Sequence, residues 1–200
     1  MRIAPAMLAI FASVFIAGFA APVQPVAAAT GQCTNWKSRE EPPPDIAVYR
    51  VSEGFVERVA FRDYVARVVS REWNVKQVEL RKAGAVAVKQ YAWYHVLRWR
   101  GGTYEGKCFD VRDTTSDQLY SSKPVEDIPA PVWQAVNATW SWRLWRGEKF
   151  PMTGYRRGAD VACAENAGYR LYVRSAKRCA AKGWSASRIL RVYYTATLLK

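Results

Sequence analysis

The sequence predicts a single α+β domain, in which a long pair of core helices packs against a mixed sheet and an export signal precedes the domain. Three observations lead to this prediction. Apolar residues recur at helical spacing through most of 61–100, and they alternate with polar residues in 46–59. The chain of 200 residues is also long enough to bury one hydrophobic core.

Residues 1–29 are predicted to be a cleaved signal peptide. They hold one basic residue, Arg2, an apolar run to about Phe19, and three alanines directly before Thr30. An uncleaved membrane anchor is the alternative, because 3–21 is almost long enough to span a bilayer. The protein is therefore expected to be secreted or associated with the cell wall.

A Pro-rich linker is predicted at 30–45, ahead of a folded domain at 46–200, because the linker contains the run EEPPP and no apolar periodicity. The first part of the domain, 46–59, is predicted to be a short hairpin. Four apolar residues share one register of its alternation, with Gly54 between them: Tyr49, Val51, Phe55 and Val59.

The first helix is predicted to begin at Asp63 as its N-cap, with Val65, Val68 and Val69 facing the core. The next position on that buried stripe is Glu72. A carboxylate there indicates either a frayed helix end or a group whose proton has a function.

A second helix is predicted over 78–99 and is expected to end before Gly101 and Gly102. It is apolar on more than one side, and small residues at Ala83, Gly84 and Ala87 would let another element approach closely.

Shorter elements are predicted after the helix pair. Residues 107–120 favour an extended segment with a turn, and 125–145 contains a helix that begins near two prolines. Strands at 140–146 and 150–155 are expected to pair across Gly147, and 185–194 is an amphipathic helix.

The chain contains four cysteines, an even set that allows two disulfides and three connectivities in an exported protein: Cys33, Cys108, Cys163 and Cys179. Separation alone favours the pair Cys163–Cys179. No metal site is predicted, because the chain lacks a CxxC motif and its one histidine, His95, lies within the long helix.

The formal net charge is +13, and it is uneven, since 141–200 holds 13 Lys and Arg residues against three acidic residues. Outside a cell, such a surface favours binding to anionic wall polymers or lipid headgroups over nucleic acid. The alternatives are that the charges only maintain solubility, or that the protein binds a membrane surface.

Five segments, taken in order, resemble the successive blocks of the stage II sporulation protein D and amidase-enhancer (SpoIID/LytB) family. They are DYVARVVSREW, KAGAVAVKQYAW, FDVRDTTSDQLY, AVNATWSWRLWRGEKF and AAKGWSASRILRVYYTATLL, and together they cover about 63–199. The family acts on bacterial peptidoglycan: some members are lytic transglycosylases, and others bind the wall or enhance an amidase.

The resemblance implies that Glu72 is the acid/base of a peptidoglycan lytic transglycosylase, without a cofactor. The alternative is a noncatalytic module that binds the wall or enhances a wall amidase. The expected partners are glycan strands or anionic wall polymers. The expected substrate contacts come from the first three blocks: Trp73, Lys89, Gln90, Asp113, Thr114 and Gln118.

One carboxylate suffices for this reaction. Hydrolytic glycosidases generally use two, whereas a lytic transglycosylase lets the 6-hydroxyl of the sugar attack the anomeric carbon. Val68 and Val69 are expected to desolvate Glu72 in part and so raise its pKa. Among the tryptophans, those expected to be exposed to a sugar are Trp73 and either Trp99 or Trp140.

The chain departs from the family pattern in three places. Arg112, Ser116 and Asp117 stand where His and Cys can bind a metal, so no metal is carried over. Residues 168–172, GYRLY, stand in place of a Gly-Trp-Gly-His-Gly segment, and Gly84 replaces a glutamine of the second block.

Overall fold

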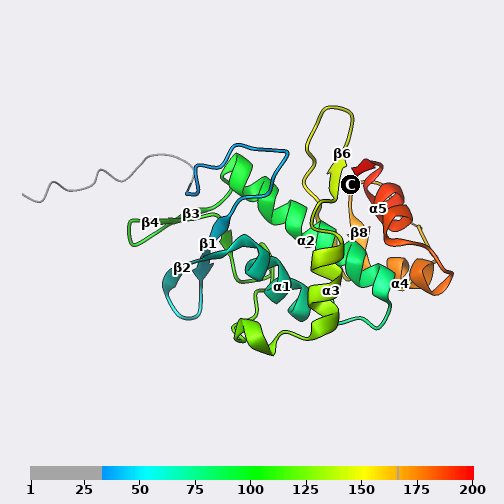
Figure 1. Cartoon of the computed structure of the whole chain (residues 1–200), viewed down its shortest axis with the longest axis horizontal. Helices are drawn as coiled ribbons and strands as arrows, with labels where there is room; N and C mark the ends of the chain where they lie inside the picture. The colour runs from blue at the N-terminus through cyan, green and yellow to red at the C-terminus, as the bar shows by residue number, and fades with distance from the viewer. Residues whose placement is uncertain (1–32, 166) are drawn as a thin grey trace, which may run out of the picture.

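The computed structural model describes residues 33–165 and 167–200, and the predicted signal peptide at 1–29 lies outside the described residues. This part of the chain is one mixed α+β domain with five α-helices and several small sheets (Figure 1). Helices α1, α2 and α3 form its centre, between the N-terminal sheet on one side and the C-terminal helices on the other. Within the described ranges, no helix has both the length and the hydropathy needed to cross a membrane.

The first hairpin forms where the alternation predicts it, but the four apolar residues of the predicted register do not lie on one face. β1 (Asp45–Arg50) pairs antiparallel with β2 (Phe55–Ala60), and Gly54 has a φ of 68° in the turn. Ile46 and Val48 are fully buried, whereas Phe55 is 44% exposed. The predicted register is wrong because Val51 lies in the turn and Val59 pairs with Ile46. Val59 therefore shares the core-facing side of Ile46 and Val48, and Tyr49 lies on the opposite side.

β1 is the central strand of a mixed sheet. β5 (Val111–Arg112) pairs with it in parallel, so the strand order is β2-β1-β5. A second hairpin, β3 (Gly102–Tyr104) with β4 (Lys107–Phe109), extends beside this sheet (Figure 1).

The first core helix, α1 (Phe61–Glu72), follows β2 directly. Its N-cap is Ala60, so the predicted cap at Asp63 is wrong. The strand leads straight into the helix, and the Phe61 N–H donates to the Pro44 carbonyl at 2.9 Å instead. Asp63 lies in the first turn, where its negative charge still complements the helix dipole.

The second core helix, α2 (Val78–Arg98), has 21 residues and ends at Trp99, which adopts a left-handed conformation with a φ of 39°. The helix ends before Gly101 and Gly102, as predicted, although its C-cap is Trp99, and Gly101 makes a close backbone contact. A Cβ there would lie 1.7 Å from the Phe109 carbonyl oxygen, so only glycine permits this approach of two backbones.

The helix pair contacts the β2-β1-β5 sheet mainly through α1. α1 packs against β1 and β2, while α2 packs against α1, α3 (Ala130–Ala138) and α5 (Ala186–Tyr194). A short 3-10 helix, η1 (Val125–Asp127), precedes α3. α5 begins where the sequence predicts it, with Ser185 as N-cap accepting the Arg188 N–H.

The predicted hairpin across Gly147 is wrong. β6 (Arg143–Trp145) pairs with β9 (Thr197–Leu199), and β7 (Tyr155–Arg156) pairs with β8 (Leu171–Tyr172) just before α4 (Val173–Ala181). Arg146 and Lys149 close a tight turn, but Pro151 has no N–H with which to continue a ladder.

Two disulfides join Cys33 to Cys108 and Cys163 to Cys179, which includes the pair favoured by separation. The first of them, together with polar contacts, attaches residues 33–44 to the domain. The Trp93 indole donates to the Ser38 carbonyl at 2.9 Å, and Arg143 pairs with Glu40. This part of the predicted linker has no helix or strand, yet it is packed on the domain.

Candidate functional site

Glu72 is the last residue of α1, and its carboxylate is held from two distant parts of the chain. Oε1 accepts the backbone N–H of Leu119 at 2.7 Å, and Oε2 accepts the hydroxyl of Tyr155. Leu119 follows β5, and Tyr155 opens β7. The end of α1 is thereby joined to the segment after β5 and to β7.

A chain of hydrogen bonds holds Tyr155 in place. Its hydroxyl accepts from Gln118 Nε2 at 3.0 Å, and Gln118 Oε1 accepts the hydroxyl of Tyr64 at 2.9 Å. Gln118 Nε2 also lies 3.3 Å from the Val88 carbonyl. Gln118, predicted to contact substrate, is buried and positions the residue that binds Glu72.

Burial raises the pKa of the Glu72 carboxyl, and the hydrogen bonds from Tyr155 and Leu119 oppose this rise. Burial likewise raises the pKa of Tyr155 well above its ordinary value. Tyr155 therefore stays a neutral hydrogen-bond donor, and Glu72 keeps its proton to a higher pH than an exposed glutamate would. A carboxyl of this kind can act as a general acid and then as a general base.

Trp73 is fully buried, so the expectation that it is exposed is wrong. Its ring lies directly over Gly84, where a Cβ would come within 2.2 Å of the indole, and it makes an edge contact with Tyr155 at 5.1 Å between centroids. The absence of a side chain at Gly84 in α2 thus leaves room for the Trp73 ring. Trp99 is 37% exposed, and Trp140 is half-buried.

Lys89 and Gln90 are also buried, and both bind the backbone of the segment that follows α3. Lys89 Nζ donates to three carbonyls, those of Thr139, Trp140 and Trp142. Gln90 exchanges hydrogen bonds with the Leu144 backbone and donates to the Pro151 carbonyl. Their observed contacts anchor this segment to α2.

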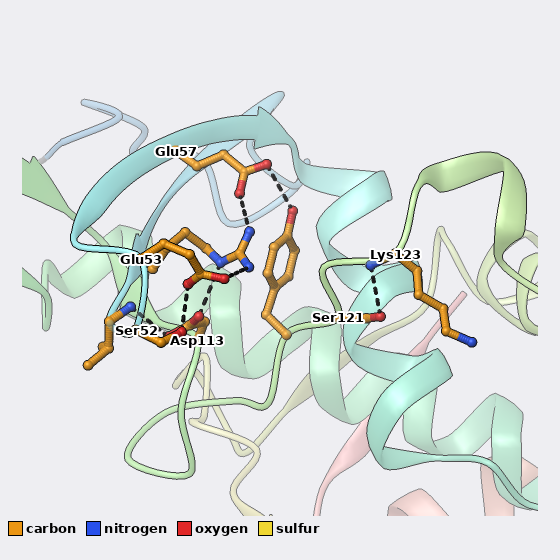
Figure 2. Close-up of polar contacts among 9 residues, drawn as sticks. Ser52, Glu53, Glu57, Asp113, Ser121 and Lys123 are labelled. Atoms are coloured by element: carbon orange, nitrogen blue, oxygen red, sulfur yellow. Dashed lines mark hydrogen bonds and ion pairs between the residues drawn. The ribbon is translucent and has the colours of Figure 1, made fainter.

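Asp113 fastens the first hairpin to the segment after β5. Its Oδ1 accepts the Val51 N–H, and its Oδ2 accepts Arg50 Nε at 3.1 Å. Figure 2 shows the carboxylates of Asp113, Glu53 and Glu57 close together. All three form ion pairs with the buried guanidinium of Arg50. The other predicted contact of this block, Thr114, accepts the Ser116 N–H within its own turn.

Asp117 lies where the family pattern can place a metal ligand. Its Oδ2 accepts the Arg112 N–H at 2.7 Å, and its Oδ1 lies 3.9 Å from Nδ1 of the buried His95. Burial lowers the pKa of His95, and the charge of Asp117 opposes this. Across 33–165 and 167–200, no group of three or more His, Cys, Asp or Glu residues is placed to hold a metal ion.

Two of the residues predicted for the site, Gln118 and Trp73, contact Tyr155 and so lie near Glu72. The other four contact other parts of the domain: Lys89, Gln90, Asp113 and Thr114. Tyr155 and Tyr64 are not predicted from the sequence. Tyr155 lies in a strand of two residues with no periodicity, and no local pattern links it to Glu72.

A comparison with protein families matches residues 49–144 to the model described as SpoIID, stage II sporulation protein. A search of curated proteins returns no match. The matched range contains Glu72 and Gln118, and it stops before Tyr155 and the segment 168–172. Residues 49–144 of this chain therefore form a SpoIID domain.

Proposed function

We propose that this protein is an exported lytic transglycosylase that cleaves the glycan strand of peptidoglycan with Glu72 as its single acid/base. The SpoIID domain indicates a role related to sporulation or the cell wall. The observation that carries the finer proposal is the carboxyl of Glu72, whose pKa is raised by burial and which Tyr155 and the Leu119 amide hold in one position.

In the proposed reaction, the Glu72 carboxyl donates its proton to the glycosidic oxygen as the bond from that oxygen to the anomeric carbon breaks. The 6-hydroxyl oxygen of the same sugar then bonds to the anomeric carbon, and the Glu72 carboxylate accepts the hydroxyl proton. The products are a free hydroxyl on the leaving sugar and a 1,6-anhydro ring, and Glu72 is again protonated. Tyr155 acts as a positioning residue.

Digestion of purified wall glycan by the mature protein tests this proposal, with 1,6-anhydro ends measured by mass spectrometry. Glu72→Gln keeps the shape of the side chain and is expected to lower the rate by about 10²–10⁴-fold. Glu126→Gln, at an exposed position on η1, is the matched control and is expected to leave the rate unchanged. Wild-type product no higher than that of Glu72→Gln would contradict the proposal.

Export is supported by the two disulfides, which persist in oxidising compartments. The mass of the protein purified from its native host tests this part of the proposal. Cleavage before Thr30 is expected, and a chain that retains 1–29 in the membrane fraction would instead indicate an uncleaved anchor.

A noncatalytic wall-binding module, with or without a partner amidase, is the second candidate. The excess of basic residues in 141–200 favours it, because that charge would attract anionic wall polymers with or without catalysis. It predicts salt-sensitive pelleting with wall sacculi that survives Glu72→Gln, together with no 1,6-anhydro product from either protein.

A further inference from the structure

A pocket of about 820 Å³ lies between the end of α2, the segment 146–154 and the segment 167–172. Its lining holds five basic residues and one acidic residue, Glu148. We call it the cationic pocket and define it by its basic residues: Arg39, Arg98, Arg146, Lys149 and Arg170. Glu72 does not line it, so the proposed cleavage reaction does not account for this group of charges.

The cationic pocket is built mostly outside the range that matches the SpoIID model. That range ends at residue 144, and the segments 146–154 and 167–172 follow it. The second of them includes GYRLY, in which the chain departs from the SpoIID/LytB pattern, and four of these five residues line the pocket: Gly168, Tyr169, Arg170 and Tyr172. The pocket is therefore a feature that the family match does not assign.

The charges of the cationic pocket have no internal counterions. Among the residues that the structure describes, no ion pair includes any of its five basic side chains. The buried Arg50, by contrast, pairs with three carboxylates. Like charges gathered in one concavity repel one another, and an anionic ligand would remove this repulsion. The pocket therefore favours a negatively charged ligand over a neutral sugar.

Two arginines of this region are held against tyrosine rings. Arg146 donates from Nη2 to the Tyr194 carbonyl, and its guanidinium lies 4.2 Å from the centre of the Tyr169 ring. Arg156 lies 5.0 Å from the centre of the Tyr172 ring. Tyr172 lines the cationic pocket and also a second pocket, of about 560 Å³, to which Arg156 contributes. Two planar donor groups are thus held in place without losing their charge, and the positive surface continues from one pocket into the next.

This arrangement favours a ligand with phosphodiester groups repeated along a strand. Cations spread over two joined pockets match negative charges that repeat, whereas a single small anion would neutralise only part of them. The cations also come from separate segments of the chain. A tetrahedral phosphate accepts donors from several directions, whereas a carboxylate accepts them close to one plane. Sugar or polyol units between the phosphates would pack against the tyrosine rings.

We propose that the cationic pocket and the second pocket, which share Tyr172, bind an anionic wall polymer joined by phosphodiesters, and that this binding holds the protein on the wall. The inference goes beyond the proposed cleavage reaction and rests only on the proposed export, which would bring the protein to such polymers. A lipid surface fits less well, because the charges lie in a concavity that a strand can enter and a flat bilayer cannot follow.

Binding of the mature protein to fluorescently labelled poly(glycerol phosphate), measured by anisotropy, tests the inference. Replacing Arg98 and Lys149 together by Gln removes two exposed charges of the cationic pocket. We expect the dissociation constant to rise at least about tenfold, a difference of about 1.4 kcal/mol. The loss of affinity between about 50 and about 200 mM salt should also be smaller in this variant, because fewer counterions are released when it binds.

The matched control replaces Lys107 and Lys182 by Gln, which removes the same charge at exposed positions outside both pockets. It should bind the polymer as the wild type does. An equal loss of affinity in the control would show that net charge alone drives binding and would overturn the inference. Polyglutamate of matched length that binds the wild type as tightly would overturn the assignment to phosphodiesters.

Vesicles that contain phosphatidylglycerol present the same phosphodiester on a lipid surface. At equal phosphate concentration, the wild type should bind the free polymer in preference to the vesicles. A preference for the vesicles that is lost when Arg98 and Lys149 are replaced would assign the cationic pocket to lipid headgroups and overturn the assignment to a wall polymer.

The two proposals fail separately in these experiments. If the wild-type protein forms 1,6-anhydro ends, but replacing Arg98 and Lys149 leaves polymer binding unchanged, the proposed function stands and the inference about the cationic pocket is wrong. If the polymer binds through Arg98 and Lys149 while no 1,6-anhydro ends form, the inference stands and the protein is a noncatalytic wall-binding module.

Discussion

The hydroxyl of Tyr155 donates a hydrogen bond to Oε2 of Glu72 across 83 positions of the sequence. The acceptor lies inside the range that matches the SpoIID model, and the donor lies outside it. Gln118, which is inside that range, holds the Tyr155 hydroxyl from its other side. The candidate acid is thus oriented by a residue that neither the family match nor the periodicity of α1 indicates.

Replacing Tyr155 by Phe should move the pH dependence of glycan cleavage. The hydroxyl stabilises the charged carboxylate, so its loss raises the pKa of Glu72 further. The protonated acid is the active form, and activity falls as pH rises through that pKa. We therefore expect the alkaline limb of the rate profile to shift to higher pH.

The rate of 1,6-anhydro formation measured across a pH series checks this shift. Tyr172→Phe, which removes a hydroxyl bound to Arg156 on the neighbouring strand, is the control and should leave the profile unchanged. An alkaline limb that stays in place or moves to lower pH in Tyr155→Phe would show that the hydroxyl does not act on the Glu72 proton.

Replacing Gly84 by Ala should destabilise the protein, although the same change inside a helix ordinarily stabilises by roughly 0.5–1 kcal/mol. The new Cβ would lie 2.2 Å from the Trp73 ring, which is fully buried and also contacts Tyr155. We expect a net loss of about 1–3 kcal/mol in the free energy of unfolding, measured with urea.

The Trp73→Ala background gives this prediction its control. Once the indole is absent, the three atoms nearest to a Cβ at position 84 are removed, so Gly84→Ala should become neutral or stabilising. An equal loss of unfolding free energy in both backgrounds would show that the new Cβ does not clash with Trp73.

Replacing Lys89 by Met should unfold the segment that follows α3. Three carbonyls would lose their donor at roughly 1 kcal/mol or more each, which predicts a loss of at least about 3 kcal/mol. Burial lowers the pKa of Lys89 to about 7, and its three acceptors match the three protons of the ammonium form. Lys182→Met, at an exposed position, should change the free energy of unfolding by less than about 0.5 kcal/mol.

Asp110 should make the stability of the protein depend on pH. Burial raises its pKa from 3.8 to about 6, against the opposing hydrogen bond from the Ala47 N–H. The folded state therefore binds this proton more tightly than the unfolded state does. Its contribution is fully present below about pH 4 and is lost as pH rises towards 6, with a span of at most about 3 kcal/mol.

Urea unfolding of the wild type and of Asp110→Asn at several pH values measures that contribution. The Asn variant keeps an acceptor for Ala47 and carries no titrating proton, so its stability should fall less than that of the wild type between pH 4 and 6. Parallel curves for the two proteins over this interval would contradict the assignment to Asp110.

The sequence predicts best where one local rule decides the structure. The stripe of Val65, Val68 and Val69 predicts α1 without reference to any other part of the chain, and Ser185 caps α5 by its own side chain. The same local reading is wrong at Gly147, where β6 leaves its neighbour in sequence and pairs with β9. The pairing of β6 with β9 depends on which segments the packing of the whole domain brings together.

By itself, the sequence determined that a carboxylate ends the buried stripe of α1, that this stretch resembles the first SpoIID block, and that Cys163 is suited to pair with Cys179. Only the tertiary structure decided what surrounds the carboxylate. Leu119 and Tyr155 reach Glu72 across 47 and 83 positions. Helical periodicity extends over neighbouring turns, whereas a hydrogen bond of this kind depends on the packing of the whole domain.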